Sequence, residues 1–132
     1  MTAKIMVTQR SVMIFRMMLS GIFLVAGFNH LMNVEGTVAK LDQASFKGMA
    51  YFIGNPEYLI IISGIVMLVA GISLFAGFKT RWVALILALV LIPITITVQI
   101  GQLNSLGPLF KNIAILGGLL FFILNDFKTT KQ

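Results

Sequence analysis

The chain has 132 residues, of which 58% are hydrophobic and 11% are charged, and its net charge is +6. A soluble domain is about 25% charged, so this composition excludes a soluble globule, whose polar surface the sequence does not supply. The ten Lys and Arg residues are scattered between apolar runs and are not interleaved with aromatic residues in a polar surface, which argues against nucleic acid as a partner.

The sequence contains no cysteine and one histidine, His30. Disulfides, dithiol redox chemistry and thiolate metal sites are therefore excluded within the chain. One histidine alone builds neither a zinc site nor a bis-histidine haem site. Because the chain also lacks a recognisable nucleophile triad, phosphate loop or carboxylate pair, we assign no catalytic residue and no metal ligand, and the chain alone builds no cofactor site.

Four apolar segments are long enough to cross a bilayer as helices, because a hydrocarbon core of about 30 Å needs roughly 20 apolar residues. They cover about residues 11–32, 56–78, 81–100 and 108–125. The first segment lacks a clear small-x-small cleavage site and leads into a second hydrophobic pattern, so we expect it to be retained and not removed as a signal peptide. The fold class expected is all-α: one integral membrane domain over residues 1–132, built as a four-transmembrane-helix bundle.

The connections between these segments differ in length and character. The polar stretch 33–55 is long, and its pattern Val38, Leu41, Ser45, Met49 and Phe52 is compatible with a short interfacial amphipathic helix. Asn55, Pro56 and Glu57 provide a cap, a proline at the first helical position and an acid in the first turn of the second helix. Pro108 gives the same proline signal for the fourth helix. The turn 77–81 is so short that the second and third helices must be antiparallel neighbours.

The distribution of Lys and Arg predicts which way the bundle faces. The side with the two termini and the turn 77–81 holds six cations, and the other side holds three. Because cytoplasmic loops carry the excess of Lys and Arg, we expect both the N and C termini to be cytoplasmic and the 33–55 loop to lie outside. The six are Lys4, Arg10, Lys79, Arg81, Lys128 and Lys131, and the three are Lys40, Lys47 and Lys111.

Polar groups of the first helix share one face with small and aromatic residues. The spacings from Arg16 through residues 20, 23 and 27 to His30 keep them within about 40° of one stripe at 100° per residue. Polar groups in membranes face the bundle interior, so this stripe is expected to point inward. Arg16 either snorkels or pairs with Asp126, or else it contacts an anion or headgroup; His30 is either a hydrogen-bonded interfacial group or a titrating or cofactor-binding group.

The second, third and fourth helices contribute further polar residues. Glu57, Gln99 and Lys111 are expected at the same outer end as His30, where they form the best pocket candidate, with Asn112 next to them. Pro93 frees a backbone carbonyl and predicts a kink in the third helix. The ligand-binding candidates are therefore Arg16, His30, Glu57, Gln99, Lys111 and Asn112.

Small residues are expected to mediate helix packing, because they let two backbones approach closely. Gly64 and Gly71 are seven residues apart on the second helix, and Gly117 and Gly118 are adjacent on the fourth. The same residues are compatible with packing between chains in a homo-oligomer. The packing candidates are Gly27, Gly64, Gly71, Gly117 and Gly118.

Several of these residues together resemble the DoxX family of small four-helix membrane proteins. The first is the helix from Arg16 to His30, which ends in Gly-Phe-Asn-His at 27–30; the second is the glycine pattern Gly64-x6-Gly71-x5-Gly77; the third is Lys-Thr-Arg at 79–81. The run Leu-Phe-Lys-Asn-Ile-Ala-Ile-Leu-Gly-Gly-Leu-Leu at 109–120 is similar to the family's last-helix signature. The sequence departs from the family pattern at Met67, where relatives often carry an acid, and at residues 98–99, where Val-Gln replaces a frequent histidine.

The resemblance implies a multi-pass protein of the bacterial cytoplasmic (inner) membrane, in contact with membrane lipids. It also implies an accessory or anchor subunit associated with a quinone-linked membrane oxidoreductase, with quinone as the cofactor and the oxidoreductase as a partner subunit. The missing acid and histidine argue against proton-coupled redox chemistry in this chain. The alternative is a non-enzymatic scaffold that binds a lipid or another small molecule.

Overall fold

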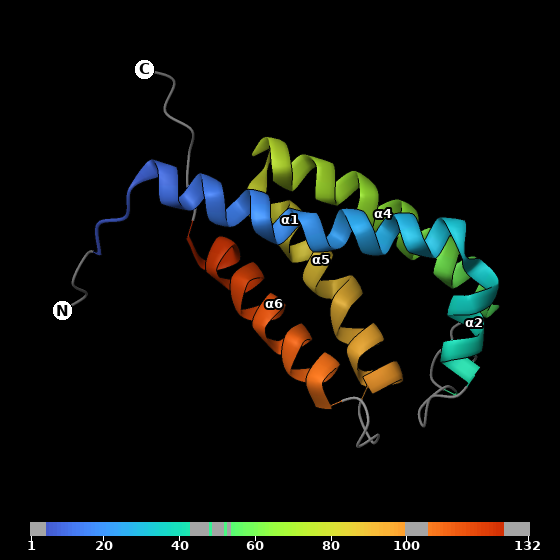
Figure 1. The fold of residues 1–132 in the computed structure, drawn as a ribbon. Coiled ribbons are helices and arrows are strands. Elements are labelled where there is room, and N and C mark those ends of the chain that lie inside the picture. The colour runs from blue at the N-terminus through green and yellow to red at the C-terminus, as the bar shows by residue number, and fades with distance from the viewer. Residues whose placement is uncertain (1–4, 43–47, 49–51, 53, 100–105, 126–132) are drawn as a thin grey trace.

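The computed structural model describes residues 5–42, 48, 52, 54–99 and 106–125, without the side chains of residues 98 and 99 (Figure 1). Over these residues the chain is helical and contains no strand. The helices are α1 (Gln9–Met32), α2 (Val34–Asp42), α4 (Pro56–Ala76), α5 (Thr80–Ile94), the π-helix η1 (Thr95–Gln99) and α6 (Leu106–Leu124).

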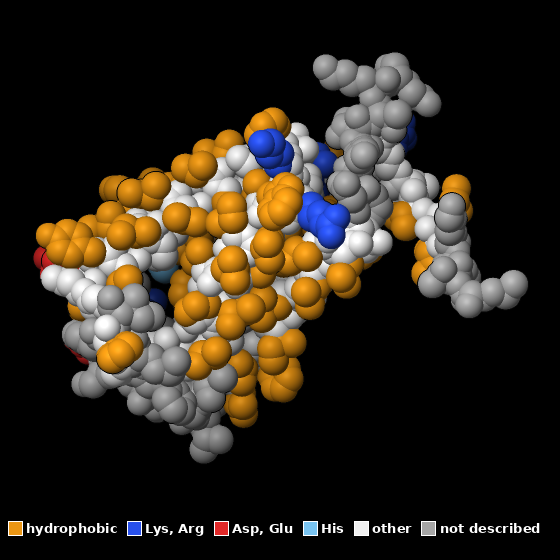
Figure 2. Space-filling model, turned by 180° about the vertical axis from the view of Figure 1, so that it is seen from behind, with side chains coloured by type: hydrophobic (Ala, Val, Ile, Leu, Met, Phe, Trp, Pro, Cys, Tyr) orange, Lys and Arg blue, Asp and Glu red, His pale blue; other side chains and the backbone are white. Residues whose placement is uncertain are grey.

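Four of these helical segments are long and apolar enough to cross a membrane. They are α1, α4, the continuous segment Thr80–Thr97 of α5 and η1, and α6. The predicted all-α bundle of four transmembrane helices is thereby confirmed. Large apolar side chains remain exposed on all four, as Figure 2 shows in orange, because lipid replaces water as their surroundings.

The ends of α1 and α4 follow from local hydrogen bonds. The hydroxyl of Thr8 accepts from the Ser11 N–H at 3.3 Å, so α1 begins two residues before the predicted start. At the start of α4, the Asn55 side chain accepts from the Glu57 N–H at 3.1 Å, and Pro56 takes the first position, as predicted. That helix ends at residue 76 because Gly77 adopts a left-handed φ of 83° and its N–H returns to the Ser73 carbonyl.

The third span changes its helical geometry after its proline. Pro93 lies one residue before the end of α5, and the next turns continue as the π-helix η1. A π-turn is the local adjustment expected where a proline removes a hydrogen bond from the ladder. The fourth span begins at Leu106, so Pro108 is its third helical residue, whereas the sequence predicted it to be the first. Pro108 still lies within the first turn, where backbone N–H groups need no helical partner.

The polar connection 33–55 starts with a short helix. α2 covers residues 34–42, and the Asn33 side chain accepts from the Gly36 N–H at 3.2 Å at its beginning. Of the positions in the expected amphipathic pattern, Val38 and Leu41 lie in α2, and Leu41 is buried. Ser45 and Met49 lie outside the described residues.

The spans form two antiparallel pairs that diverge from each other (Figure 1). α1 packs most extensively along α4, and α5 packs mainly on α6. The two pairs stay close where α1 begins and α6 ends, which we call the terminal end, and move apart towards α2, which we call the α2 end. There α2 contacts both α4 and η1. The described first part of the expected outside loop, residues 33–42, belongs to the α2 end.

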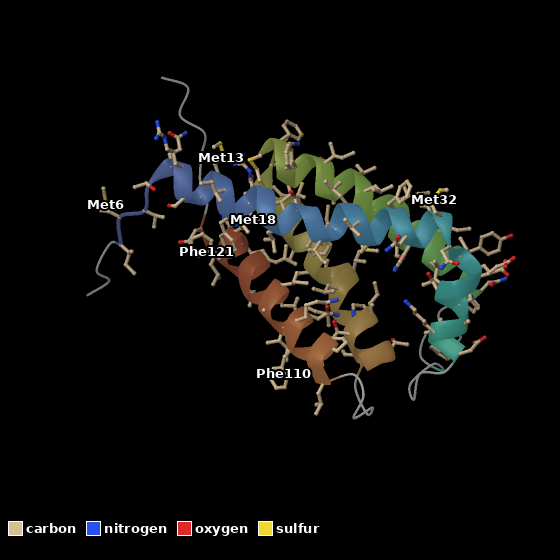
Figure 3. All side chains as sticks on the ribbon, viewed as in Figure 1. Met6, Met13, Met18, Met32, Phe110 and Phe121 are labelled. Carbon is tan, nitrogen blue, oxygen red and sulfur yellow. The ribbon has the colours of Figure 1, made fainter. Side chains whose placement is uncertain are left out.

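The core lies between the pairs at the middle and the terminal end. Leu74, Leu87 and Leu119 are fully buried there, together with Phe122. The ring of Phe15 on α1 lies 5.3 Å from that of Phe122 and 5.6 Å from that of Phe121 on α6, which is labelled in Figure 3. These aromatic contacts join the first and last spans at the terminal end.

Candidate functional site

The polar stripe of α1 points into the bundle, as the spacing predicted. Ser20, Phe23 and Gly27 are buried, and Arg16 and His30 are partly exposed at the two ends of the stripe. The Ser20 hydroxyl donates to the Met17 carbonyl at 2.7 Å, which satisfies it within its own helix. The groups left for function are therefore the two at the ends, which lie at opposite ends of the bundle.

His30 forms a polar pair with Ser63 of α4 near the α2 end. The His30 Nδ1 lies 3.0 Å from the Ser63 Oγ, and the Ser63 hydroxyl lies 2.8 Å from the Ile60 carbonyl. A hydroxyl has one proton, so when it donates to the carbonyl its oxygen accepts from an Nδ1–H. In a neutral imidazole this leaves Nε2 as a hydrogen-bond acceptor.

Glycines bring α1 and α4 close enough for this pair to form. A Cβ added at Gly27 would lie 2.9 Å from the Gly64 carbonyl oxygen, and a Cβ at Gly64 would lie 3.1 Å from that of Gly27. The first distance is too short for a Cβ unless the backbone shifts, and the second is tighter than most Cβ contacts in proteins. Gly71 packs in the same way against Leu24 of α1, at 3.1 Å. A continuous seam of small residues therefore fixes the register of the two helices and the position of His30.

Asn112 of α6 forms a second polar pair with Thr95, the first residue of η1. The Asn112 Nδ2 donates to the Thr95 Oγ1 at 3.0 Å, and the Thr95 hydroxyl donates to the Leu91 carbonyl at 2.8 Å. Both side chains are about 5% exposed, and Thr97 is buried nearby in the chain. Within the described residues, Thr95 is the hydrogen-bond partner of Asn112, so the amide Oδ1 and its second N–H remain available to a ligand.

The two polar pairs lie at the same end of the bundle but on different helix pairs. His30 is in the last turn of α1 and Ser63 is near the start of α4, whereas Thr95 follows α5 and Asn112 is near the start of α6. This is the α2 end, where the helix pairs diverge (Figure 1). Figure 2 shows a recess in the surface towards this end, in which the histidine, coloured pale blue, is visible beside a Lys or Arg side chain.

Of the other residues predicted for the outer cluster, two do not join these pairs in the described part of the chain, and the side chain of the third is not described. Glu57 and Lys111 are exposed, and neither is hydrogen-bonded to His30 in the described part of the chain. Gln99 is the last residue of η1, and its side chain lies outside the described residues. The structure thus brings His30 to Ser63 and Asn112 to Thr95. The sequence signal that could have identified these two partners is the presence of Ser and Thr hydroxyls inside apolar spans.

The remaining packing glycines lie on different faces of α6. A Cβ at Gly118 would lie 3.1 Å from the Phe15 ring and 3.2 Å from the Leu19 side chain, so this residue packs against α1. Gly117 is exposed, and a Cβ there would meet no atom within 4 Å. Gly117 therefore makes no close packing contact with the residues that the structure describes.

The chemistry available at the α2 end is hydrogen bonding in an apolar surrounding. No group of three His, Cys, Asp or Glu that could hold a metal ion occurs among the described residues. The site offers an imidazole acceptor from one helix pair and a buried amide from the other. Such a set can bind and orient a small molecule with polar groups on its head and an apolar body.

Comparison with known proteins identifies the family. No curated protein and no solved structure matches the chain. The family model of DoxX matches residues 11–100, which run from α1 to the end of η1. The residues of the resemblance at 109–120 lie beyond the matched range, whereas those in α1, α4 and the turn before α5 lie within it. Because the match covers more than half of the sequence and the four spans can cross a membrane, this chain is a multi-pass membrane protein that belongs to the DoxX family.

Proposed function

We propose that this protein is an accessory or anchor subunit of a quinone-linked membrane oxidoreductase and that it binds a quinone at the α2 end. The observation that carries the proposal is the presence of two buried or half-buried polar pairs, His30 with Ser63 and Asn112 with Thr95, at one end of an otherwise apolar bundle. Polar groups inside a membrane are costly, and they are retained where they bind or transport something.

The chemistry of the two pairs fits a quinone or its reduced form. The head of a quinol carries two hydroxyl groups on opposite sides of a ring, and the quinone carries two carbonyl oxygens at the same places. The His30 Nε2 can accept from a hydroxyl, and the free N–H of Asn112 can donate to an oxygen. The surface recess in which the histidine is visible lies at this end (Figure 2).

The proposed accessory role rests on two features of the chain: it has groups that can hold a quinone, and its sequence has few residues that could hold a redox centre. A quinone carries electrons when it is bound, and this chain would hold and orient its head. The sequence has no cysteine and one histidine, so a redox centre that exchanges electrons with the quinone would come from a partner subunit. The setting proposed is the bacterial cytoplasmic membrane, with the termini on the cytoplasmic side. The open surface at Gly117 suits packing between copies of the chain in a homo-oligomer.

A second function, a non-enzymatic scaffold that holds a lipid or another small molecule, has its own supporting observation. His30 and Asn112 each already have a hydrogen-bond partner within the chain. Both pairs would therefore be stable without a ligand, as interhelical contacts that specify the fold.

Quinone analysis of the purified protein separates the two functions. The full chain is produced in a quinone-containing bacterium, transferred to nanodiscs, and extracted for mass spectrometry. We expect quinone well above the amount in empty nanodiscs, and a loss of this excess in a His30→Leu, Asn112→Leu double variant. Lys111→Gln, which changes an exposed residue at the same end, is the matched control and should retain quinone. Quinone at the level of empty nanodiscs, or retained equally by the double variant, would favour the scaffold.

A further inference from the structure

The terminal end of the bundle concentrates positive charge. The cations described there are Arg10, Arg16, Lys79 and Arg81. The three carboxylates that the structure describes, Glu35, Asp42 and Glu57, all belong to the α2 end. Figure 2 shows several Lys and Arg side chains at one end of the molecule and Asp or Glu side chains at the other, where a Lys or Arg side chain also lies beside the histidine. The terminal end therefore attracts anions.

Within this cluster, the guanidinium of Arg16 lies where a larger side chain at position 77 would otherwise project. A Cβ added at Gly77 would lie 2.8 Å from both Cζ and Nη1 of Arg16 and 3.0 Å from Nη2. The guanidinium thus lies flat against the backbone where α4 ends. Gly77 also has a φ of 83°, a backbone conformation that L side chains rarely adopt, so the backbone itself requires a glycine here. We call this arrangement the Arg16–Gly77 cradle.

The donors of Arg16 are not used up by the described residues. Its Nε is buried and has no hydrogen-bond partner among the residues that the structure describes, although the side chain as a whole is partly exposed. The carbonyl end of α4 is electrostatically favourable for a cation, but the carbonyls of Ser73 and Leu74 accept from backbone N–H groups of the turn. Asp126, the carboxylate expected as an alternative partner, lies outside the described residues. A guanidinium presents its donors as a planar fork that suits phosphate.

The surroundings of the cradle are those of a membrane interface. Phe78 and Trp82 are about two-thirds exposed in the turn and first residues after α4, and the Lys79 Nζ lies 5.5 Å from the Phe78 ring centre. Tryptophan is enriched at the level of lipid headgroups. Ile72 and Phe75 of α4 are exposed deeper in the span, where an acyl chain can cover them. Arg16 lies about 10 Å along α1 from its first residue, and its side chain leans back towards the interface.

We propose that the Arg16–Gly77 cradle, together with Lys79, binds the phosphate of an anionic phospholipid whose acyl chains lie along the exposed face of α4. The charge of the cluster selects an anionic headgroup, the planar fork of Arg16 holds the phosphate, and the apolar surface beside it distinguishes a lipid from a free anion. This site lies at the opposite end from the quinone site and does not depend on it.

Native mass spectrometry of the full chain in detergent tests the site directly. The protein is titrated with dioleoylphosphatidylglycerol and with dioleoylphosphatidylcholine, which share the same acyl chains. We expect a preference for phosphatidylglycerol that falls about fivefold in Arg16→Gln, the loss expected for one cation at the headgroup. Lys40→Gln removes the same charge from an exposed position at the α2 end and should keep the preference. Gly77→Ala should lower it without any change of net charge.

The controls make each outcome decisive. Equal helix content by circular dichroism and equal phosphatidylcholine binding show that a variant has folded. Inorganic phosphate at the lipid concentration should not displace phosphatidylglycerol; displacement would show a free-anion site and overturn the lipid assignment. The proposal is also overturned if phosphatidylglycerol binding is unchanged in Arg16→Gln. It fails likewise if Asp126→Asn and Arg16→Gln lower the melting temperature alike without affecting lipid binding, because Asp126 is then the partner of Arg16.

Discussion

Gly64 and His30 face each other at the closest approach of α1 and α4, where a Cβ added at Gly64 would lie 2.9 Å from the Cβ of His30. Ser63, the preceding residue, lies within hydrogen-bond distance of the His30 ring, at 3.0 Å from Nδ1. The packing seam and the polar pair are therefore parts of the same contact. A substitution that pushes the two backbones apart should therefore both weaken the packing of α1 on α4 and displace His30.

Gly64→Ala is expected to destabilise the protein. The added Cβ overlaps the backbone and His30, and overpacking of this kind costs about 1 to 3 kcal/mol. Thermal unfolding in detergent, followed by circular dichroism, measures the loss. Gly21→Ala on α1 is the control, because a Cβ there meets no atom within 4 Å and alanine favours a helix. A loss of similar size in both variants would show that the seam is not the cause.

The hydrogen bond between Asn112 and Thr95 is expected to couple α6 to η1. A double-mutant cycle of Asn112→Ala and Thr95→Val should give a coupling free energy of about 0.6 kcal/mol, the average for such bonds in a membrane. Unfolding of the four proteins in the same detergent supplies the cycle. Asn125→Ala removes an exposed amide that, among the described residues, donates to the Phe121 carbonyl four residues before it, and it should change stability little. Additive effects of the two substitutions would contradict the bond.

The ring of Phe15 is expected to stabilise the contact between the first and last spans. Phe15→Ala removes the rings' contacts at 5.3 and 5.6 Å, which contribute about 0.5 to 1.5 kcal/mol beyond area burial. The melting temperature should fall more than in Phe28→Ala, where the lost ring is exposed on the same helix. Equal falls in the melting temperatures of the two variants would mean that the loss of lipid contact alone explains the destabilisation.

Both termini are expected on the cytoplasmic side. The chain has no cysteine, so single cysteines can be placed at residues 2 and 35 without a background. A membrane-impermeant thiol reagent added to intact cells should label Glu35→Cys and should label Thr2→Cys only after the membrane is opened. The Lys and Arg count, with six cations on one side and three on the other, is the reason for this expectation. The reverse labelling pattern would place the termini outside.

The sequence predicted the four spans because hydropathy reports directly on the length of apolar helix. Their exact ends depended on single contacts, such as the left-handed Gly77 that stops α4 before residue 78. The inward stripe of α1 was also readable, because helical spacing places Ser20, Phe23 and Gly27 on one face.

The partners of the polar residues were not readable in the same way. Glu57 and Lys111 share the outer end with His30 by topology, yet a helix end exposes most of its circumference, and both side chains are exposed. Ser63 reaches His30 because Gly64 allows the backbones to meet, and Thr95 reaches Asn112 across two helices. Such pairings depend on the relative rotation of the helices, which packing sets and spacing within one helix does not.

Ligand-induced stabilisation tests the central claim, that His30 and Asn112 bind a quinone headgroup. The melting temperature of the full chain in detergent is measured with increasing amounts of a short-tailed quinol, against a matched alcohol without the ring. At a ligand concentration 100 times Kd, binding adds about 2.7 kcal/mol to stability. The account predicts a saturable rise in the melting temperature for the parent chain and for Lys111→Gln, and none for His30→Leu. An equal rise in His30→Leu, or no rise in any of the three, would contradict it.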